Sequence, residues 1–543
     1  MNALAGTWAL FRAGLKRDKA RLATWAVAIP LTHWGVAVAL RSVFSDDPAS
    51  MAARGAIMET PTGVIFGGPG YGSDHYTVAA MISNEMTLYY ELPLAIGLLL
   101  LVTRATRGDE ESGRFELIGA ASVGRLAALT SGLVTALLLA VLNGALLSAV
   151  GVAVGLDAAS SLAWAWGIAG CGFLFAALGA LVAQLTSLER SANMAALVAV
   201  GIAFMLRAIG DMQQQHGSWL SWLSPLAWTQ QLRAYVELRL WPLSLYLVVS
   251  AVLVTVAFAL AARRDLGAGL LPDRLGRVTA PRSLASPMAL ALRLLRTNVL
   301  VWLITTLALG AACGPLMAQL GEYVRENAEV YEKIFGLPTD AADQLLAHSF
   351  MAYLLLFFTV FGAVVGVTAT GRLRAAEIQG TMEAQLARPV SRYRLLGAWC
   401  TVGLAVPVLL LTLGAFTMGV LTPEGYWGDS SSALTFGLHL AGQSLVYLPA
   451  AAIVTGVAVA LFGWAPKLIG VAWGSLGYVV LCGMFGQLLA LPDWAIKVSG
   501  VGATPLLPSQ PMQWPPVLIM SVIAAALIVL GFIGFRRRDV PAN

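Results

Sequence analysis

Residues 110–125 read EESGRFELIGAASVGR, and residues 377–392 read EIQGTMEAQLARPVSR. Both fit the pattern ExxGxxExxxAxxVxR, and each follows an apolar segment long enough to cross a bilayer. A polar, charged helix is therefore expected at the same place in both halves of a membrane protein. In a permease, this is where force from a partner protein would arrive.

The composition around these segments is that of a membrane protein. Of the 543 residues, 58% are hydrophobic and 12% are charged, and the mean hydropathy is +0.76. A soluble fold of this size needs more polar surface, so the sequence predicts an all-α polytopic membrane protein. No cleavable signal peptide is predicted, because the basic N-terminal stretch leads directly into an ordinary span.

The apolar runs predict twelve transmembrane helices, six in each half. The first six lie near Leu22–Leu40, Ile82–Val102, Leu126–Val152, Ala163–Leu185, Asn193–Ala208 and Leu243–Ala262. The second six lie near Leu300–Leu316, Phe350–Thr370, Gly397–Leu421, Leu434–Phe462, Leu468–Leu489 and Val517–Phe535.

The basic residues predict the orientation. If the N-terminus is cytoplasmic, most of the 34 Lys and Arg fall on cytoplasmic segments, so the positive-inside rule places both termini inside the cell. The net charge of +5 then reflects membrane topology and attraction to anionic headgroups, and nucleic acid is not an expected partner. We expect a multi-pass protein of the cytoplasmic membrane.

Further repeats support a duplicated six-span unit. The sixth span ends in Arg263-Arg264-Asp265 and the twelfth in Arg537-Arg538-Asp539, while SPL at 224–226 matches TPL at 504–506. Because six is even, the two units are expected to run parallel about an axis along the membrane normal. The predicted organisation is a first repeat over 1–266, a cytoplasmic linker over 267–287 and a second repeat over 288–543.

Motifs for enzymatic chemistry are missing. The chain contains no Gly-Lys dipeptide, which a phosphate-binding loop requires, and neither HExxH nor CxxC occurs. The five His are scattered and the four Cys fall inside predicted spans, where they are typical of packing residues. The sequence therefore predicts no catalytic residue, no metal site and no cofactor bound by this chain.

The two repeated segments have an ordinary interpretation as solvated turns between spans, but their duplication favours a docking role. Glycine lets a partner backbone approach closely, and acidic residues near basic ones offer polar contacts. The predicted docking residues for an ATPase partner are Glu110, Glu111, Gly113, Arg114, Glu116, Arg125, Glu377, Gly380, Glu383, Arg388 and Arg392.

On these segments the chain resembles the membrane subunit of type 2 ABC exporters, specifically the actinobacterial fused permeases that export polyketide antibiotics, including the tetronasin-resistance permeases. The family consensus is close to EExGRxELLLAxPVSR, and each half preserves a different part of it. Ser122 departs from the consensus proline, which Pro389 keeps, and Thr381 stands where the first half has Arg114.

The resemblance implies a type V exporter architecture over essentially the whole chain. It implies that both repeated segments are coupling helices seated on two copies of a separate ATPase, with ATP and Mg bound in that partner. It also implies interfacial elbow helices in the N-terminal basic stretch and in residues 288–296.

The resemblance places a substrate conduit between the second and fifth spans of the two halves. These spans contain Tyr89, Tyr90, Glu91, Phe204, Met205, Arg207, Tyr353, Phe357, Phe358, Phe361, Tyr478, Met484, Phe485 and Gln487. Aromatic and Met side chains suit bulky amphipathic molecules, although for any single aromatic the favoured explanation is core packing or lipid contact.

Glu91 carries more weight, because a charge at membrane depth usually faces a partner or a water-filled cavity. We predict an ion pair between Glu91 and Arg207. The alternative places Arg207 beside Asp211 at the outer interface. His33 and His439 are expected to be satisfied polar groups between helices rather than proton carriers.

The leading functional hypothesis is ATP-powered export of a hydrophobic or amphipathic compound, with hydrolysis in the partner. One alternative is a proton-coupled secondary transporter, which would need a titrating membrane carboxylate such as Glu91. Another is a membrane signalling subunit that binds an ATPase without moving cargo. The identity of the cargo does not follow from the sequence, because apolar linings accept many shapes.

Overall fold

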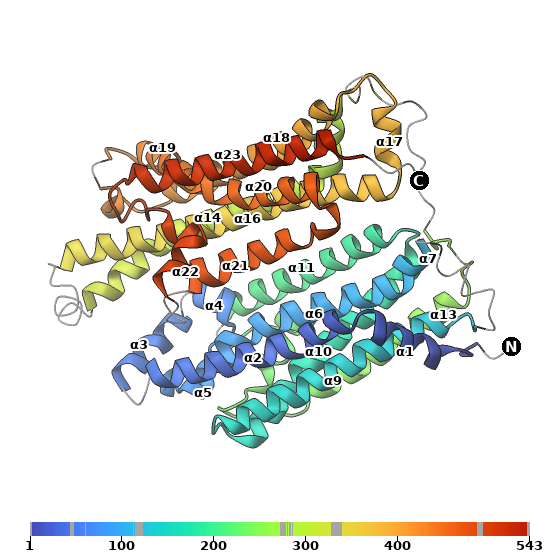
Figure 1. Cartoon of the computed structure of the whole chain (residues 1–543). Helices are drawn as coiled ribbons and strands as arrows, with labels where there is room; N and C mark the ends of the chain where they lie inside the picture. The colour runs from blue at the N-terminus through green and yellow to red at the C-terminus, as the bar shows by residue number, and fades with distance from the viewer. Residues whose placement is uncertain are drawn as a thin grey trace. The chain divides into compact units, whose positions relative to one another are not determined.

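The protein is an all-α polytopic membrane protein (Figure 1). A computed structural model describes residues 3–43, 48–59, 61–111, 113, 123–214, 216–265, 267–271, 279, 281, 284, 286–326, 339–428, 430–485 and 492–539. Helices are the only regular secondary structure in these ranges. The chain forms two compact units, Met1–Gly276 and Arg277–Asn543, called the first and second unit below. The proposed limits of the linker, 267–287, stay a prediction.

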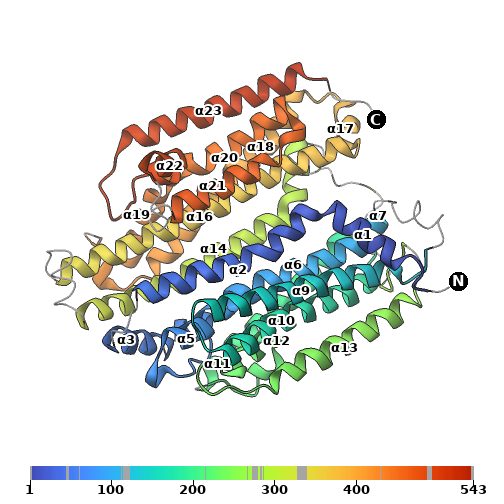
Figure 2. The same ribbon diagram turned by 60° about the horizontal axis from the view of Figure 1, so that its bottom comes forward.

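The first unit is a bundle of long helices that run side by side (Figures 1 and 2). Its main helices are α1 (Thr7–Arg17), α2 (Lys19–Val43), α6 (Thr87–Thr103), α9 (Ala127–Ala153), α10 (Ala158–Leu185), α11 (Glu189–Gln213) and α13 (Pro242–Ala261). The short helices α3 (Pro48–Glu59), α4 (Pro61–Gly67), α5 (Val78–Met81), α7 (Asp109–Glu111) and α12 (Pro225–Trp228) connect them.

Helix α10 shows how the local sequence sets these elements. Its first turn is capped by Asp157, whose carboxylate accepts a hydrogen bond of 2.8 Å from the backbone N–H of Ser160. This bond lowers the pKa of Asp157 below its ordinary value. The apolar residues that follow are buried on most of the helix, so α10 lies at the centre of the unit.

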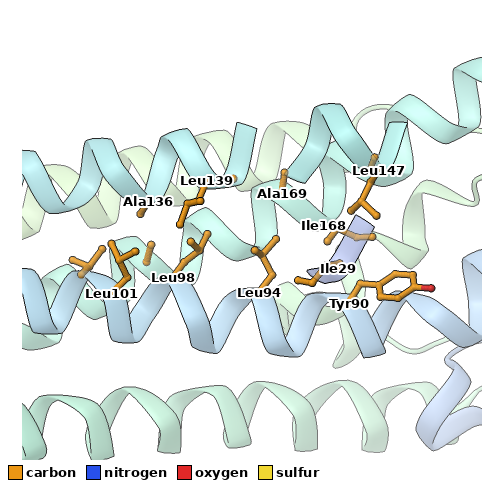
Figure 3. Close-up of a cluster of buried hydrophobic side chains, with 14 of the residues drawn as sticks. Ile29, Tyr90, Leu94, Leu98, Leu101, Ala136, Leu139, Leu147, Ile168 and Ala169 are labelled. Atoms are coloured by element: carbon orange, nitrogen blue, oxygen red, sulfur yellow. The ribbon is translucent and has the colours of Figure 1, made fainter. Parts of the chain in front are cut away.

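The core of the first unit lies between α6, α9 and α10. Figure 3 shows Leu94, Leu98 and Leu101 of α6 pointing toward the small and branched side chains of the other two helices. Their neighbours include Leu139 of α9 and Ile168 of α10, all of them buried. The hydrophobic effect contributes little between helices in lipid, so close van der Waals packing of this kind stabilises the bundle.

The second span is longer than the apolar run that predicts it. Between α5 and α7 the chain is continuously helical over Val78–Glu111, with π-helical turns at Ile82–Met86 and Arg104–Gly108. The second π-turn lies directly before the repeated segment. π-turns of this sort occur often at functional sites.

The second unit repeats the helix order. Its helices are α14 (Pro287–Glu326), α16 (Thr339–Ile378), α17 (Thr381–Leu386), α18 (Arg392–Val420), α19 (Ala433–Ser444), α20 (Leu448–Trp464), α21 (Val471–Phe485), α22 (Asp493–Val498) and α23 (Trp514–Arg537). Helices α20 and α23 approach closely, because Gly463 and Gly531 face each other. A Cβ atom at Gly531 would lie 2.4 Å from the carbonyl oxygen of Val459.

Eleven helices in the described ranges are long and apolar enough to cross a membrane, and they correspond to eleven of the twelve predicted spans. The remaining prediction, near Leu468–Leu489, corresponds to the shorter α21 and to residues outside the described ranges. The elbow predicted at 288–296 belongs to the start of the continuous helix α14, whereas α1 is separated from α2 by a break at Asp18.

Candidate functional site

The repeated segment of the second unit contains a short helix at one end of the bundle. Helix α17 follows Gly380, whose φ of 71° is a left-handed conformation that favours glycine. Met382 is fully buried in the core that includes Leu395 and Leu396, and Leu386 packs against the same cluster. Packing on this face directs the remaining face of α17 outward.

The outward face of α17 and of the turn after it is polar or small, whereas Ile378, the last residue of α16, is an exposed apolar side chain of the same segment. Thr381, Ala384, Ala387 and Arg388 are exposed, while Glu383 is half-buried. A surface of this kind accepts a partner without exposing a large apolar patch.

Glu377, at the start of the segment, is an internal ion-pair partner. Its carboxylate accepts two hydrogen bonds from the Arg538 guanidinium, of 2.5 and 3.1 Å, and Arg374 lies 2.8 Å away, one turn earlier on α16. Only 1% of the Glu377 side chain is exposed. Paired bonds between a planar guanidinium and a carboxylate are short and directional, so this contact fixes the end of α16 against the end of α23.

Arg392, at the other end of the segment, binds the same helix terminus. Its guanidinium donates to the backbone carbonyls of Phe535, Arg536 and Arg538 at 3.2, 3.1 and 2.5 Å. The last carbonyls of a helix lack partners within the helix and carry partial negative charge, so a cation there is stabilising.

The first unit contains the same arrangement. Glu110 accepts two hydrogen bonds from Arg264, of 2.5 and 3.0 Å, and a third of 3.0 Å from Arg107, one turn earlier. Arg125 donates to the backbone carbonyl of Arg264. Gly113 has a φ of 71°, the value found at Gly380.

Other predicted docking residues of the first unit differ in their setting. The Glu111 carboxylate accepts a hydrogen bond of 3.0 Å from the backbone N–H of Glu189, the first residue of α11. An acidic group at a helix N-terminus is stabilising. Arg114 and Glu116 lie outside the described residues. Whether any predicted docking residue contacts an ATPase stays a prediction.

The predicted pairing of Glu91 with Arg207 is wrong. Arg207 Nε lies 3.2 Å from Asp211 Oδ2, and both side chains are fully buried. The guanidinium also donates to the carbonyl of Ile65 at 3.1 Å, and Asp211 accepts a bond of 2.6 Å from Ser221. The i,i+4 spacing on α11 brings Arg207 and Asp211 together within one turn.

Glu91 is fully buried on α6, beside Thr229, Tyr246 and Cys171 and within electrostatic range of Arg207. Neither carboxylate oxygen has a hydrogen bond of acceptable geometry to a described residue. Tyr246 instead shares a hydrogen bond of 2.9 Å with Thr229. A buried carboxyl without strong partners is costly to keep charged.

The aromatic residues of the predicted conduit fall into separate environments. Tyr89, Met205, Tyr353 and Phe357 are exposed, Tyr90 and Phe358 are buried in cores, and Phe204, Phe361 and Tyr478 are half-buried. Backbone positions 484 and 485 are helical, but nothing is described for the side chains of Met484 and Phe485, and Gln487 lies outside the described residues. The conduit between the halves stays a prediction.

The two histidines differ from expectation. His33 is buried against Tyr90 and Trp164, with ring centroids 5.5 and 5.0 Å away, and neither ring nitrogen is hydrogen-bonded to a described residue. His439 is exposed on α19. Within the described residues, the expectation that both histidines are hydrogen-bonded polar groups between helices is therefore not met.

An apolar cavity of about 500 Å³, open along the surface of the unit, lies between α9, α10 and α13. It is lined by residues that include Leu137, Val141, Trp166, Phe173 and Leu247. Tyr246 and Ser250 are also among its lining residues. Because Tyr246 also lies beside Glu91, the cavity is one side chain away from the buried carboxyl.

Comparison with known proteins identifies the family. The family described as "Multidrug efflux system permease Rv1217c, C-terminal domain" matches residues 18–261 and 284–536. The multidrug efflux system permease protein Rv1217c of Mycobacterium tuberculosis is 34% identical over 549 aligned residues, which cover 99% of this chain and 96% of that protein. The chain belongs to this family of multidrug efflux permeases.

In this efflux permease, sequence reasoning missed the arginines that hold the repeated segments. Arg264 and Arg538 belong to the predictions only as a repeated helix ending, and Arg107 and Arg374 are not among the predicted residues. The available signal was that both the acidic motif and the basic ending are duplicated in the same order.

Metal and thiol chemistry has no visible site in the described parts of the efflux permease. All four cysteines are buried as free thiols, on four different helices. Across the described ranges, no cluster of three or more His, Cys, Asp or Glu side chains is arranged to hold a metal ion.

Proposed function

We propose that this chain is the permease subunit of an ATP-driven efflux complex, in which a separate ATPase docks on the two repeated segments. The observation that carries this proposal is that both units hold the segment in the same way, with an acidic start, a left-handed glycine and a basic end. A simple turn between spans would not explain why the same contacts hold this short polar segment in both units.

The proposed partner is two copies of an ATPase that binds ATP and Mg, because one fused permease offers two docking segments. This corresponds to the type 2 ABC exporter architecture with parallel six-span repeats and cytoplasmic termini. A closer relationship to polyketide-antibiotic exporters of the tetronasin-resistance kind is part of the same proposal. The motif and the basic helix endings support it.

The proposed cargo is hydrophobic or amphipathic. The apolar cavity between α9, α10 and α13 offers contact area with few fixed hydrogen-bonding groups, which suits varied shapes. The relative from Mycobacterium tuberculosis is named as a multidrug efflux permease, and we extend that activity to this chain.

Copurification tests the proposal. The permease is co-expressed with a candidate ABC ATPase from the same genome, and ATP turnover is measured for the intact chain and for Glu116→Arg combined with Glu383→Arg. We expect turnover only with the partner, and loss of association in the double variant. Glu424→Arg, in a short 3-10 helix of a predicted outward loop, is the matched charge control. Normal association of the double variant would contradict docking at these segments.

Glu91 favours a second candidate, a proton-coupled transporter, because its carboxyl is fully buried next to the wall of an apolar cavity. Transport into inverted vesicles separates the two mechanisms. Drug uptake that needs ATP and persists in Glu91→Gln supports the exporter. Uptake that follows a proton gradient without ATP and is abolished in Glu91→Gln supports the second candidate. ATPase binding without any uptake would indicate a signalling subunit.

A further inference from the structure

We propose that Arg264 and Arg538 are positioning residues that bind each docking segment to the end of the sixth helix of its own unit, so that motion of the ATPase is delivered to that helix. The inference rests on the proposed function, because it assumes that an ATPase docks on these segments. We call each arginine with its carboxylate partner a clamp: Arg264 with Glu110, and Arg538 with Glu377.

The two clamps have the same chemistry. Each arginine uses both terminal nitrogens on both carboxylate oxygens, at 2.5 and 3.0 Å in the first unit and at 2.5 and 3.1 Å in the second. A second arginine, three residues before the carboxylate, adds a bond of 3.0 or 2.8 Å. The carboxylates are 10% and 1% exposed, so water competes little with these bonds.

A second contact closes each segment into a loop. Arg125 and Arg392, fifteen positions after the carboxylates, donate to backbone carbonyls at the end of the same sixth helix. Both ends of the segment are thus attached to one helix terminus. A push on the segment cannot displace it without moving the end of that helix or breaking charged hydrogen bonds.

The clamps also divide the repeated motif into two functional parts. The first Glu and the last Arg of ExxGxxExxxAxxVxR bind residues of their own unit, so they do not belong to the surface that a partner contacts. In the second unit, the exposed Thr381 and Ala384 of α17, together with Arg388 in the turn after it, are left for the ATPase. The partner therefore contacts the middle of the motif, and the ends of the motif transmit the force.

The arginines of the two clamps make different additional contacts. Arg264 Nε donates to Gln184 at 2.7 Å, near the end of the fourth span. Arg538 instead lies over the rings of Phe462, near the end of the fourth span of its unit, and Phe535, at 5.1 and 5.6 Å. The second clamp depends more on the planar guanidinium itself, so lysine should replace Arg538 poorly.

The test uses hydrogen exchange of the full permease without any partner. We expect the backbone amides of 381–386 to exchange about tenfold faster in Arg538→Gln and Glu377→Gln, because a buried ion pair that loses one member opens locally. Arg537→Gln is the matched control, since Arg537 is the exposed neighbouring arginine. The swapped variant Glu377→Arg with Arg538→Glu should recover part of the protection. Unchanged exchange in both single variants would overturn the clamp.

A second measurement uses the intact complex with its ATPase. We expect Arg538→Gln and the milder Arg538→Lys to keep association and basal ATP turnover, but to lose most of the stimulation by a transported drug. Drug stimulation equal to that of the intact chain would overturn the transmission role, whatever the exchange shows. If no ATPase copurifies with the intact chain, the proposed function fails, while the exchange experiment still decides whether the clamp exists.

Discussion

Replacing Arg207 by methionine leaves the Asp211 carboxylate buried with the Ser221 hydroxyl as its remaining side-chain partner, and we expect this to destabilise the C-terminal part of α11. At 3.2 Å, the attraction between the two charges is about 5 kcal/mol for an effective dielectric constant of about 20. Most of this energy offsets the cost of burying both charges. Removing one partner is therefore expected to cost about 3–5 kcal/mol of unfolding free energy.

A double-mutant cycle measures this interaction by reversible unfolding in mixed detergent micelles. Arg207→Met with Asp211→Leu removes both charges, and the double variant should be within about 1 kcal/mol of the intact chain. The coupling energy is then several kcal/mol. The same cycle for Arg207 with Glu91→Gln should give a smaller coupling than the cycle with Asp211, since no direct bond joins Arg207 and Glu91 and they interact only at longer range.

Two results would refute this reasoning. If each single variant at Arg207 and Asp211 costs less than about 1 kcal/mol, the pair is not buried as the structure shows. If the double variant costs the sum of the singles, the two side chains do not act on each other. A larger coupling of Arg207 to Glu91 than to Asp211 would restore the original sequence prediction.

Gly380→Ala should cost about 1 kcal/mol and slow drug-stimulated ATP turnover of the complex, because its φ of 71° is left-handed, whereas Gly474→Ala, in open space on α21, should have no effect. Gly531→Val should lower the thermal unfolding midpoint of the permease, because even a Cβ there would meet the carbonyl of Val459 at 2.4 Å; a normal midpoint would contradict the close approach of α20 and α23. Hydrogen bonds from two arginines hold the pKa of Glu237 below its ordinary value of 4.5. The folded-state pKa is thus the lower one, so its stabilising contribution is present above pH 4.5 and is lost as the pH falls, and Glu237→Gln should flatten this part of the midpoint-against-pH curve.

Much of the candidate site could be predicted from the sequence, because its signals are local. The repeated segments stand out by composition between apolar runs, and Gly113 and Gly380 mark the same left-handed turn in both units. Their ion-pair partners could not be derived in this way. Glu110 and Arg264 are 154 residues apart, and Glu377 and Arg538 are 161 apart, so no periodicity connects them.

The prediction at Glu91 shows the same limit. A charged residue in a span does require an explanation, and the sequence identified both Glu91 and Arg207 correctly as unusual. The pair of Arg207 with Asp211 is local, because the two residues are four positions apart on α11, and the sequence offers it as an alternative. Whether Glu91 also faces Arg207 depends on the rotation of α6 and α11 about their axes, which apolar spans leave open because lipid and protein neighbours are equally apolar. The structure places Glu91 beside Thr229 and Tyr246.

The sequence by itself determined that this chain spans a membrane with helices and that it carries the same polar segment and the same basic helix ending twice. These properties follow from hydropathy and short-range spacing, which are present in the chain before it folds. Only the tertiary structure decided that the ends of each segment belong to the terminus of the sixth helix of the same unit. Helix packing brings these distant groups to one end of the bundle, and a guanidinium and a carboxylate pair firmly only when both are placed in the right geometry away from water.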